Sequence, residues 1–256
     1  MSTQDRLFLP FDGYEIPAVL TCPEHTDMPY PAVLMLHGFL SYKEGDGHLL
    51  ARLADAFAGN GVASLRMDFC SMGESRCDRM YYGMGQMLKE TAFAFHWMQM
   101  AGKLDSSRLA ILGHSLGAKT AFLSAGLEPK VLIGINGAYG HVALGDEKGC
   151  RAQGHTIVYT SDGRHELLFP RFFDELNAYA DLSAARVFRG HAILCIGKED
   201  PTVPPEYSRQ LAASLPDAEV YEAEGANHTF NAKTTDGTKV KELAAWLNSS
   251  LDRCLK

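Results

Sequence analysis

The stretch Leu109-Ala110-Ile111-Leu112-Gly113-His114-Ser115-Leu116-Gly117-Ala118 decides the fold. Its first four residues form an apolar run, which is typical of a strand buried on both faces of a sheet. A helical pattern follows over residues 118–125 with almost no loop between. The Gly-x-Ser-x-Gly motif at the junction suits a very sharp strand-to-helix turn, because its glycines leave room for the backbone. We therefore predict that Ser115 lies at this turn, in a strained conformation with its hydroxyl exposed.

The rest of the chain alternates short apolar strands with helices, which favours an α/β fold with a mostly parallel sheet and helices on both faces. The predicted strands are Ile16–Cys22, Ala32–Leu36, Val62–Met67, Leu109–Leu112, Val131–Ile135, Ala192–Ile196 and Glu219–Glu222. The predicted helices are His48–Ala58, Met84–Lys103, Leu116–Ala125, Pro205–Leu215 and Lys239–Leu251. Only Asp12-Gly13 separates the strand that includes Ile16–Cys22 from the chain segment before it, which is a hairpin signal, so the sheet is expected to begin antiparallel. Without a repeat or linker, residues 1–256 are expected to form one domain.

Residues 137–189 break this alternation, because they separate two core strands by far more chain than a crossover helix needs. The segment is rich in histidine, tyrosine and phenylalanine, and long insertions of this kind are usually functional. We expect it to form a cap within the single domain. Tyr159 and Asp162 lie beside Gly163, where a turn could lower them toward Ser115. They are therefore candidates for a polar contact with a substrate hydroxyl.

An acyl-transfer serine needs a base and a carboxylate that orients the base, and in this fold they follow the serine in the order acid, then histidine. Asp200 comes just after the apolar strand 192–196, and His228 comes after the strand 219–222. The carboxyl ends of parallel strands lie at one edge of the sheet, so these loops can converge on Ser115. Glu199 is the near competitor for the carboxylate. The simpler alternatives are that Asp200 is only a turn residue before Pro201 and that His228 is only an exposed loop histidine.

Two backbone amides are needed to stabilise the oxyanion of an acyl-transfer reaction. The amide of Leu116 follows the nucleophile directly. The second is expected from Phe39 in His37-Gly38-Phe39-Leu40, where the glycine lets the chain turn sharply. Asp68, in another loop that follows a strand, is expected to hold loops together rather than to take part in catalysis.

A nucleotide-binding alternative rests on the same residues. Gly113-(x4)-Ala118-Lys119-Thr120 differs by one residue from the phosphate-binding loop G-x-x-x-x-G-K-[ST]. Ala118 stands where that loop has its second glycine, and its Cβ obstructs the close wrapping of a phosphate. The acid and the histidine that follow favour the hydrolase interpretation.

Composition excludes several classes of protein. With 46% hydrophobic and 21% charged residues, the chain is neither disordered nor a coiled coil. A formal charge of −7 without a basic run argues against nucleic acid or an anionic membrane as partner. Neither a signal peptide nor an apolar run of about 18 residues is visible, so a cytoplasmic protein is expected. The six cysteines lack a CxxC pair and are expected to be free thiols rather than disulfides or zinc ligands.

Several motifs in this order resemble the α/β-hydrolase family. They are His37-Gly38-Phe39, Asp68-(x4)-Gly73-(x)-Ser75, the motif at 113–117, the Asp200 loop and Glu224-Gly225-Ala226-Asn227-His228. Within that family the chain is most similar to the bacterial cinnamoyl/feruloyl esterases, although Leu116 and Asn227 stand where that group often has Gln and Asp. The resemblance implies an eight-stranded sheet, a cap after the sixth strand, and Phe39 and Leu116 as oxyanion donors.

The expected function is therefore that of a serine esterase with Ser115, His228 and Asp200 as its triad, with no metal or organic cofactor. Its expected partner is a small-molecule ester, of the cinnamoyl or feruloyl type by resemblance, and a homodimer stays an open option. A thioesterase, an acylglycerol lipase or a small-peptide hydrolase could use the same triad. An alternative from another class is a ligand-binding protein that keeps the fold without catalysis.

Overall fold

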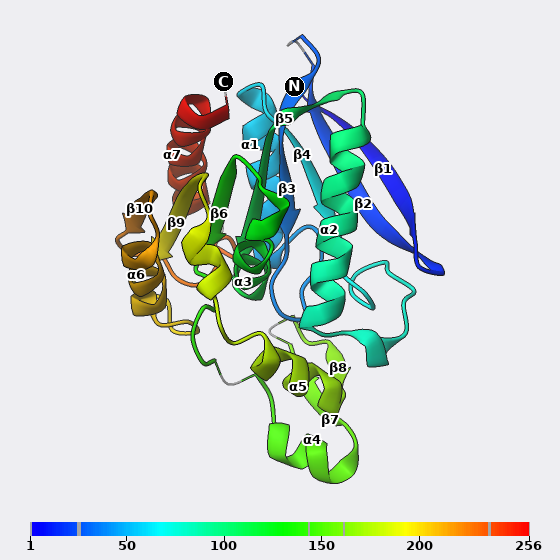
Figure 1. Cartoon of the computed structure of the whole chain (residues 1–256). Coiled ribbons are helices and arrows are strands. Elements are labelled where there is room, and N and C mark those ends of the chain that lie inside the picture. Colours follow the sequence, from blue (N-terminus) through cyan, green and yellow to red (C-terminus); the bar gives the residue numbers. More distant parts are fainter. Residues whose placement is uncertain (1, 25–26, 143, 161, 235–236, 256) are drawn as a thin grey trace.

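An eight-stranded sheet forms the centre of the computed structural model, which describes residues 2–24, 27–142, 144–160, 162–234 and 237–255 (Figure 1). The strand order is β1-β2-β4-β3-β5-β6-β9-β10, and all neighbours run parallel except β1–β2 and β2–β4. The strands are β1 (Ser2–Phe11), β2 (Tyr14–Pro23), β3 (Tyr30–Leu36), β4 (Ala63–Met67), β5 (Leu104–His114), β6 (Val131–Ile135), β9 (His191–Gly197) and β10 (Ala218–Ala223). This is the predicted α/β-hydrolase architecture, including the hairpin across Asp12-Gly13.

Helices cover both faces of the sheet, and an apolar cluster fills the space on each side. One cluster includes α1 (Leu49–Gly59) and α7 (Thr238–Leu255). The other includes α2 (Met84–Met100), α3 (Leu116–Leu123) and α6 (Pro205–Ser214). Strands β3 and β6 are buried along their whole length, as continuous apolar runs in central parallel strands require. Short 3₁₀ turns lie at Asp46–His48, Arg79–Tyr81, Ala125–Leu127 and Ser183–Val187.

Most element boundaries differ from the prediction, by one to five residues. Helix α2 ends at Met100 rather than Lys103, because Ala101 already has an extended backbone. Strand β5 begins at Leu104, five residues before the predicted start, and Leu104 pairs with Tyr30 across an irregularity in the ladder. The sequence did not predict this first part of the strand, because residues 105–108 are polar and do not continue the apolar run of the buried part.

The segment between β6 and β9 has secondary structure of its own and lies beyond the carboxyl ends of the strands (Figure 1). It contains α4 (Glu147–Gln153), the antiparallel pair β7 (Thr156–Tyr159) and β8 (His165–Leu168), and α5 (Pro170–Ala178). The Phe172 ring stacks on Tyr82, with 5.5 Å between ring centroids, and lies 5.3 Å from the ring of Phe39. We refer to residues 137–189 as the cap, and Phe172 anchors it to the body.

The expectation that all six cysteines are free thiols is wrong for one pair. Cys70 and Cys77 form a disulfide, with their Cα atoms 5.0 Å apart. The loop after β4 turns back on itself at Ser71 and Gly73, which both have positive φ, and this brings the two cysteines together. Spacing alone could not reveal the pair, because the six residues between the two cysteines form no recognisable motif with them. The other four cysteines are free: Cys22, Cys150, Cys195 and Cys254.

The packing of α3 against β3 predicts the effect of adding one methyl group. A Cβ on Gly117 would lie 2.3 Å from the carbonyl oxygen of Leu36 and 2.4 Å from that of His37, and neither backbone atom can move cheaply. Gly117→Ala should therefore lower the free energy of unfolding by about 2 kcal/mol or more. Gly126→Ala is the matched control, since its Cβ would meet nothing within 4 Å. Equal urea midpoints for the two variants would contradict this close packing.

Candidate active site

Ser115 occupies the strained turn that its motif predicts. Its backbone has φ 56° and ψ −118°, and α3 begins at the next residue. The Ser115 N–H donates to the carbonyl of Ile135 on β6 at 2.9 Å, and the N–H of Ala138 donates to the Ser115 carbonyl at 3.1 Å. A positive φ costs a residue with a side chain on the order of 1–3 kcal/mol, so these bonds hold a conformation that the chain would otherwise leave.

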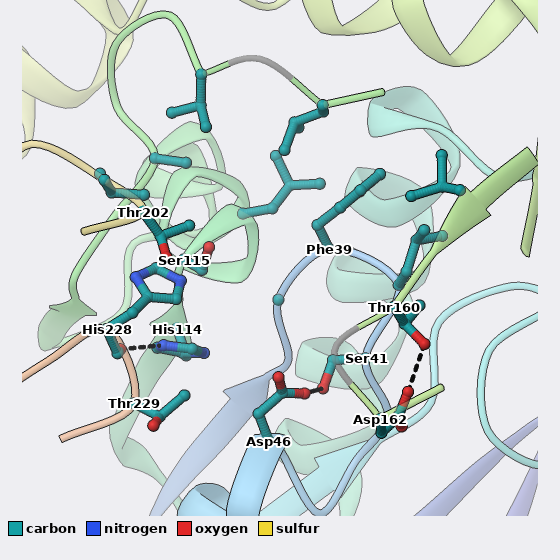
Figure 2. A pocket seen from close by; sticks show the side chains of 18 of the residues that line it. Phe39, Ser41, Asp46, His114, Ser115, Thr160, Asp162, Thr202, His228 and Thr229 are labelled. Atoms are coloured by element: carbon teal, nitrogen blue, oxygen red, sulfur yellow. Dashed lines mark hydrogen bonds between the residues drawn. The ribbon is translucent and has the colours of Figure 1, made fainter. Parts of the chain in front are cut away.

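His228 and Asp200 come together beside Ser115. Nδ1 of His228 lies 2.7 Å from Oδ2 of Asp200, whose side chain is 1% exposed. The other oxygen of Asp200 accepts the amides of Thr202 and Val203, at 2.7 and 3.0 Å. Figure 2 shows the Ser115 side chain next to the His228 ring. Glu199 is exposed, so the structure places Asp200 and not its neighbour against the histidine.

The two residues predicted as oxyanion donors, Phe39 and Leu116, line the same cavity as Ser115. Within the described residues, the N–H groups of Phe39 and Leu116 donate to no protein acceptor. Gly38 allows this approach, because a Cβ there would lie 3.2 Å from Cβ of Ser115. The next residue, Leu40, is fixed on both sides: its N–H donates to the Tyr82 hydroxyl at 3.1 Å, and its carbonyl accepts from Arg164 of the cap at 2.6 Å.

Ser115 and His228 line a cavity of about 390 Å³ between the body and the cap. Its wall is mainly apolar, with Phe39, Leu40, Leu116, Val142, Val158 and Val203 among the lining residues. Both predicted substrate contacts line it as well. Tyr159 is 72% exposed. The Thr160 hydroxyl donates to the Asp162 carboxylate (Figure 2), which also accepts from Arg164 at 2.9 Å. Asp162 therefore supports the Arg164 contact to the Leu40 carbonyl.

His114, next to the serine, holds the histidine loop. Its Nε2–H donates to the His228 carbonyl at 2.8 Å (Figure 2). Burial, reinforced by the charge of His228, lowers the pKa of His114 to about 4, so the ring is neutral at pH 7. His114 therefore has a structural part, because it holds the loop that carries His228.

Asn136 joins the loops of the site, and the sequence analysis missed it. Its amide group donates to the carbonyls of Asn227 and His228, at 3.1 and 2.9 Å, and its oxygen accepts the Gly197 amide at 2.7 Å. It follows β6 directly and has φ 44°. Asn136 has the same positional signal as Asp200, because both residues lie just after strands at the active edge of the sheet. Asparagine is also one of the few residues that tolerate this backbone region.

Asp68 lies away from the reacting groups, in a buried network. Its carboxylate accepts the amides of Lys43 and Glu74 and the ammonium of Lys43, at 2.7, 2.9 and 2.7 Å. A Cβ on Gly73 would lie 2.3 Å from the Asp68 carboxylate. The network ties the loop after β4 to the loop after β3 that carries Phe39. This geometry matches the loop-holding part expected of Asp68.

The geometry does not support the nucleotide-binding alternative, because the loop is not shaped to wrap a phosphate. Ala118 is fully buried, and the Thr120 hydroxyl donates to the Leu116 carbonyl at 3.0 Å instead of facing a ligand. Among the described residues, no three His, Cys, Asp or Glu side chains gather as metal ligands would. In the same part of the chain, no helix is both long and apolar enough to cross a membrane.

The model of the prolyl oligopeptidase family matches residues 78–254, which is more than half of the chain. The chain belongs to the prolyl oligopeptidase family. The matched segment carries Ser115, Asp200 and His228, whereas Phe39 lies before it. The family match and the α/β-hydrolase fold together make the protein a hydrolase.

Solved structures of similar fold cover almost the whole of this prolyl oligopeptidase family member. Est1E from Butyrivibrio proteoclasticus, solved with ferulic acid bound, has a TM-score of 0.79 at 17% identity, covering 97% of this chain and 98% of that one. A soluble variant of monoglyceride lipase from Saccharomyces cerevisiae, in complex with a substrate analogue, has a TM-score of 0.82 at 15% identity, covering 100% and 97%. At these identities the likeness concerns the fold.

A curated relative matches part of the chain. It is an uncharacterized 31.7 kDa protein of the traX-finO intergenic region of Escherichia coli, 25% identical over 105 residues. The match covers 41% of this chain and 36% of that protein, so the two share little more than a third of the relative's length.

The bonds of Asn136 predict the effect of a nearly isosteric change. In Asn136→Asp, one oxygen still accepts the Gly197 amide, but the other faces the carbonyls of Asn227 and His228 without a proton to donate. The histidine loop should move, and kcat for ester hydrolysis should fall about tenfold or more while KM changes little. A variant with unchanged kcat and a circular dichroism spectrum like that of the parent would show that Asn136 does not position His228.

Proposed function

We propose that this hydrolase cleaves carboxylic esters through an acyl-enzyme on Ser115. The observation that carries the proposal is the Asp200–His228 pair beside a serine with φ 56°, at the floor of an apolar cavity. A buried carboxylate on Nδ1 leaves the other ring nitrogen of His228 to take the serine proton. A protein that kept only the fold would have no need for this arrangement.

In the proposed reaction, His228 accepts the Ser115 proton as the serine oxygen attacks the acyl carbonyl. The amides of Phe39 and Leu116 stabilise the oxyanion of the tetrahedral intermediate. The start of α3 behind Ser115 adds a favourable partial positive charge. His228 then protonates the leaving alcohol, and water releases the acyl group by the same route. Asp200 fixes the tautomer of His228 and stabilises the imidazolium.

Small aromatic esters of the cinnamoyl or feruloyl type are the proposed substrates. The cavity of about 390 Å³ is of a size for one small molecule, and Phe39 contributes an aromatic wall. The likeness to Est1E, solved with ferulic acid, supports this choice. Tyr159 and Asp162, on the cap side of the cavity, are the proposed contacts for a substrate hydroxyl.

A second candidate is the cleavage of small peptides, which the prolyl oligopeptidase family match favours. The same triad serves amides, thioesters and acylglycerols, and the pocket selects among them. Amide cleavage needs a better-stabilised leaving group, so p-nitroanilides and p-nitrophenyl esters with the same acyl group separate the two candidates. We expect kcat/KM to be far higher for the esters.

The nucleophile is tested with p-nitrophenyl esters and methyl ferulate. Ser115→Ala should keep the fold and lose hydrolysis of every ester in the panel, to below a few per cent of the parent. Ser124→Ala is the matched control, because Ser124 lies on the same segment but its hydroxyl donates to the Thr120 carbonyl. Retained ester hydrolysis by pure Ser115→Ala protein would refute the proposal.

The carboxylate is tested by comparing two neighbours. Asp200→Asn should lower kcat roughly a thousandfold or more, since an amide at this position favours the wrong tautomer of His228. Glu199→Gln should change kcat little, because the Glu199 side chain is exposed. A larger loss for Glu199→Gln than for Asp200→Asn would contradict the assignment.

A further inference from the structure

Lys119 is a buried cation that the proposed mechanism does not use. It lies on α3, one helical turn after Ser115, and only 3% of the residue is exposed. Within the described residues its ammonium has neither an ion-pair nor a hydrogen-bond partner, and burial alone lowers its pKa. Lysine is almost never buried to this degree unless it is paired, because an unpaired charge is costly away from water.

The side chain of Lys119 lines a second cavity, of about 290 Å³, between α3 and the cap. Part of the ammonium surface is accessible to solvent. Fully buried side-chain nitrogen and oxygen atoms without a hydrogen-bond partner occur elsewhere in the described residues, but the Lys119 nitrogen is not one of them. The other lining residues include the apolar side chains of Leu116, Phe173 and Leu176. Glu147 also lines this cavity, but it forms no ion pair with Lys119, and its Oε1 accepts two bonds from Arg151, at 3.1 and 2.8 Å.

This cavity adjoins the one that contains Ser115. Four residues line both: Leu116, Ala138, Val142 and Leu144. Ser115 and Lys119 are four residues apart, so their backbone levels along the helix axis differ by about 6 Å at a rise of about 1.5 Å per residue. A short aliphatic spacer therefore bridges the distance from a carbonyl at the serine to a group at the lysine.

We propose that Lys119 binds a carboxylate at the far end of the substrate, so that the preferred esters carry a negative charge a few carbon atoms from the reacting carbonyl. This inference rests on the proposed ester hydrolysis and narrows its substrate class. A carboxylate fits better than a phosphate, because Lys119 is the single lysine or arginine among the described residues that line the cavity. Phosphate sites bring together several donors, usually including backbone amides.

Two pairs of isosteric esters test which half of the substrate carries the charge. For the acyl half, the pair is mono-p-nitrophenyl adipate and p-nitrophenyl 6-methylheptanoate. For the alcohol half, it is the butyrate esters of 5-hydroxypentanoate and of 5-methylhexan-1-ol. In each pair a carboxylate replaces an isopropyl group of similar shape. We expect the wild-type protein to prefer the charged member of one pair in kcat/KM by ten- to a hundredfold.

Lys119→Met should abolish that preference while keeping hydrolysis of the neutral esters. It should also raise the melting temperature, because a buried charge is removed. Lys119→Arg should restore part of the preference, and Lys119→Gln replaces the Met variant if that one does not fold. Lys148→Met is the matched control, since Lys148 is exposed on α4 and does not line the cavity. The control should keep the full preference.

Binding to Ser115→Ala protein separates this proposal from the proposed function. Monomethyl adipate should bind to it more tightly than methyl 6-methylheptanoate, and adding Lys119→Met should remove the difference. If wild-type protein prefers neither charged ester and the binding difference is also absent, the Lys119 site is wrong. A preference that survives Lys119→Met overturns it as well. Lysine-dependent binding without any Ser115-dependent hydrolysis would instead refute the esterase and uphold the site.

Discussion

The backbone conformation of Ser115 is the constraint on which the rest of the site depends. A serine with φ 56° and ψ −118° persists only if its surroundings hold it there. Here β6 supplies the carbonyl that binds its N–H, while the first turn of α3 and the amide of Ala138 bind its carbonyl. Three glycines leave room for this turn. A Cβ on Gly38 would lie 3.2 Å from Cβ of Ser115, one on Gly113 would collide with the carbonyl of Gly117, and one on Gly117 would collide with the carbonyls of Leu36 and His37. The nucleophile is thus held by the centre of the sheet.

Hydrogen bonds between loops supply the rest of the geometry. Asn136 binds the loop of the acid and the loop of the histidine at once, and His114 adds a bond to the same histidine loop. On the other side, Arg164 of the cap holds the Leu40 carbonyl beside the Phe39 amide. The cap therefore reaches the proposed oxyanion site through a charged contact as well as through the ring of Phe172. A change in cap position would alter both the cavity and the oxyanion amides.

The sequence predicted those features that depend on local pattern. Buried parallel strands are continuous apolar runs, and the residues just after them meet at one edge, so the pattern alone places Ser115, Asp200 and His228 near one another. Asp200 could not be separated from Glu199 in this way, because only the fold decides which side chain turns inward. Asn136, the Cys70–Cys77 disulfide and the isolation of Lys119 depend on contacts between distant or irregular segments, which periodicity does not encode.

Covalent labelling tests the central claim most directly. A fluorophosphonate reacts with a serine only where a base and an oxyanion site activate it. The account predicts one adduct per chain, which mass spectrometry finds on the peptide that contains Ser115. It also predicts that the Asp200→Asn variant forms no adduct. An unlabelled protein, or an adduct on a serine other than Ser115, would contradict the account.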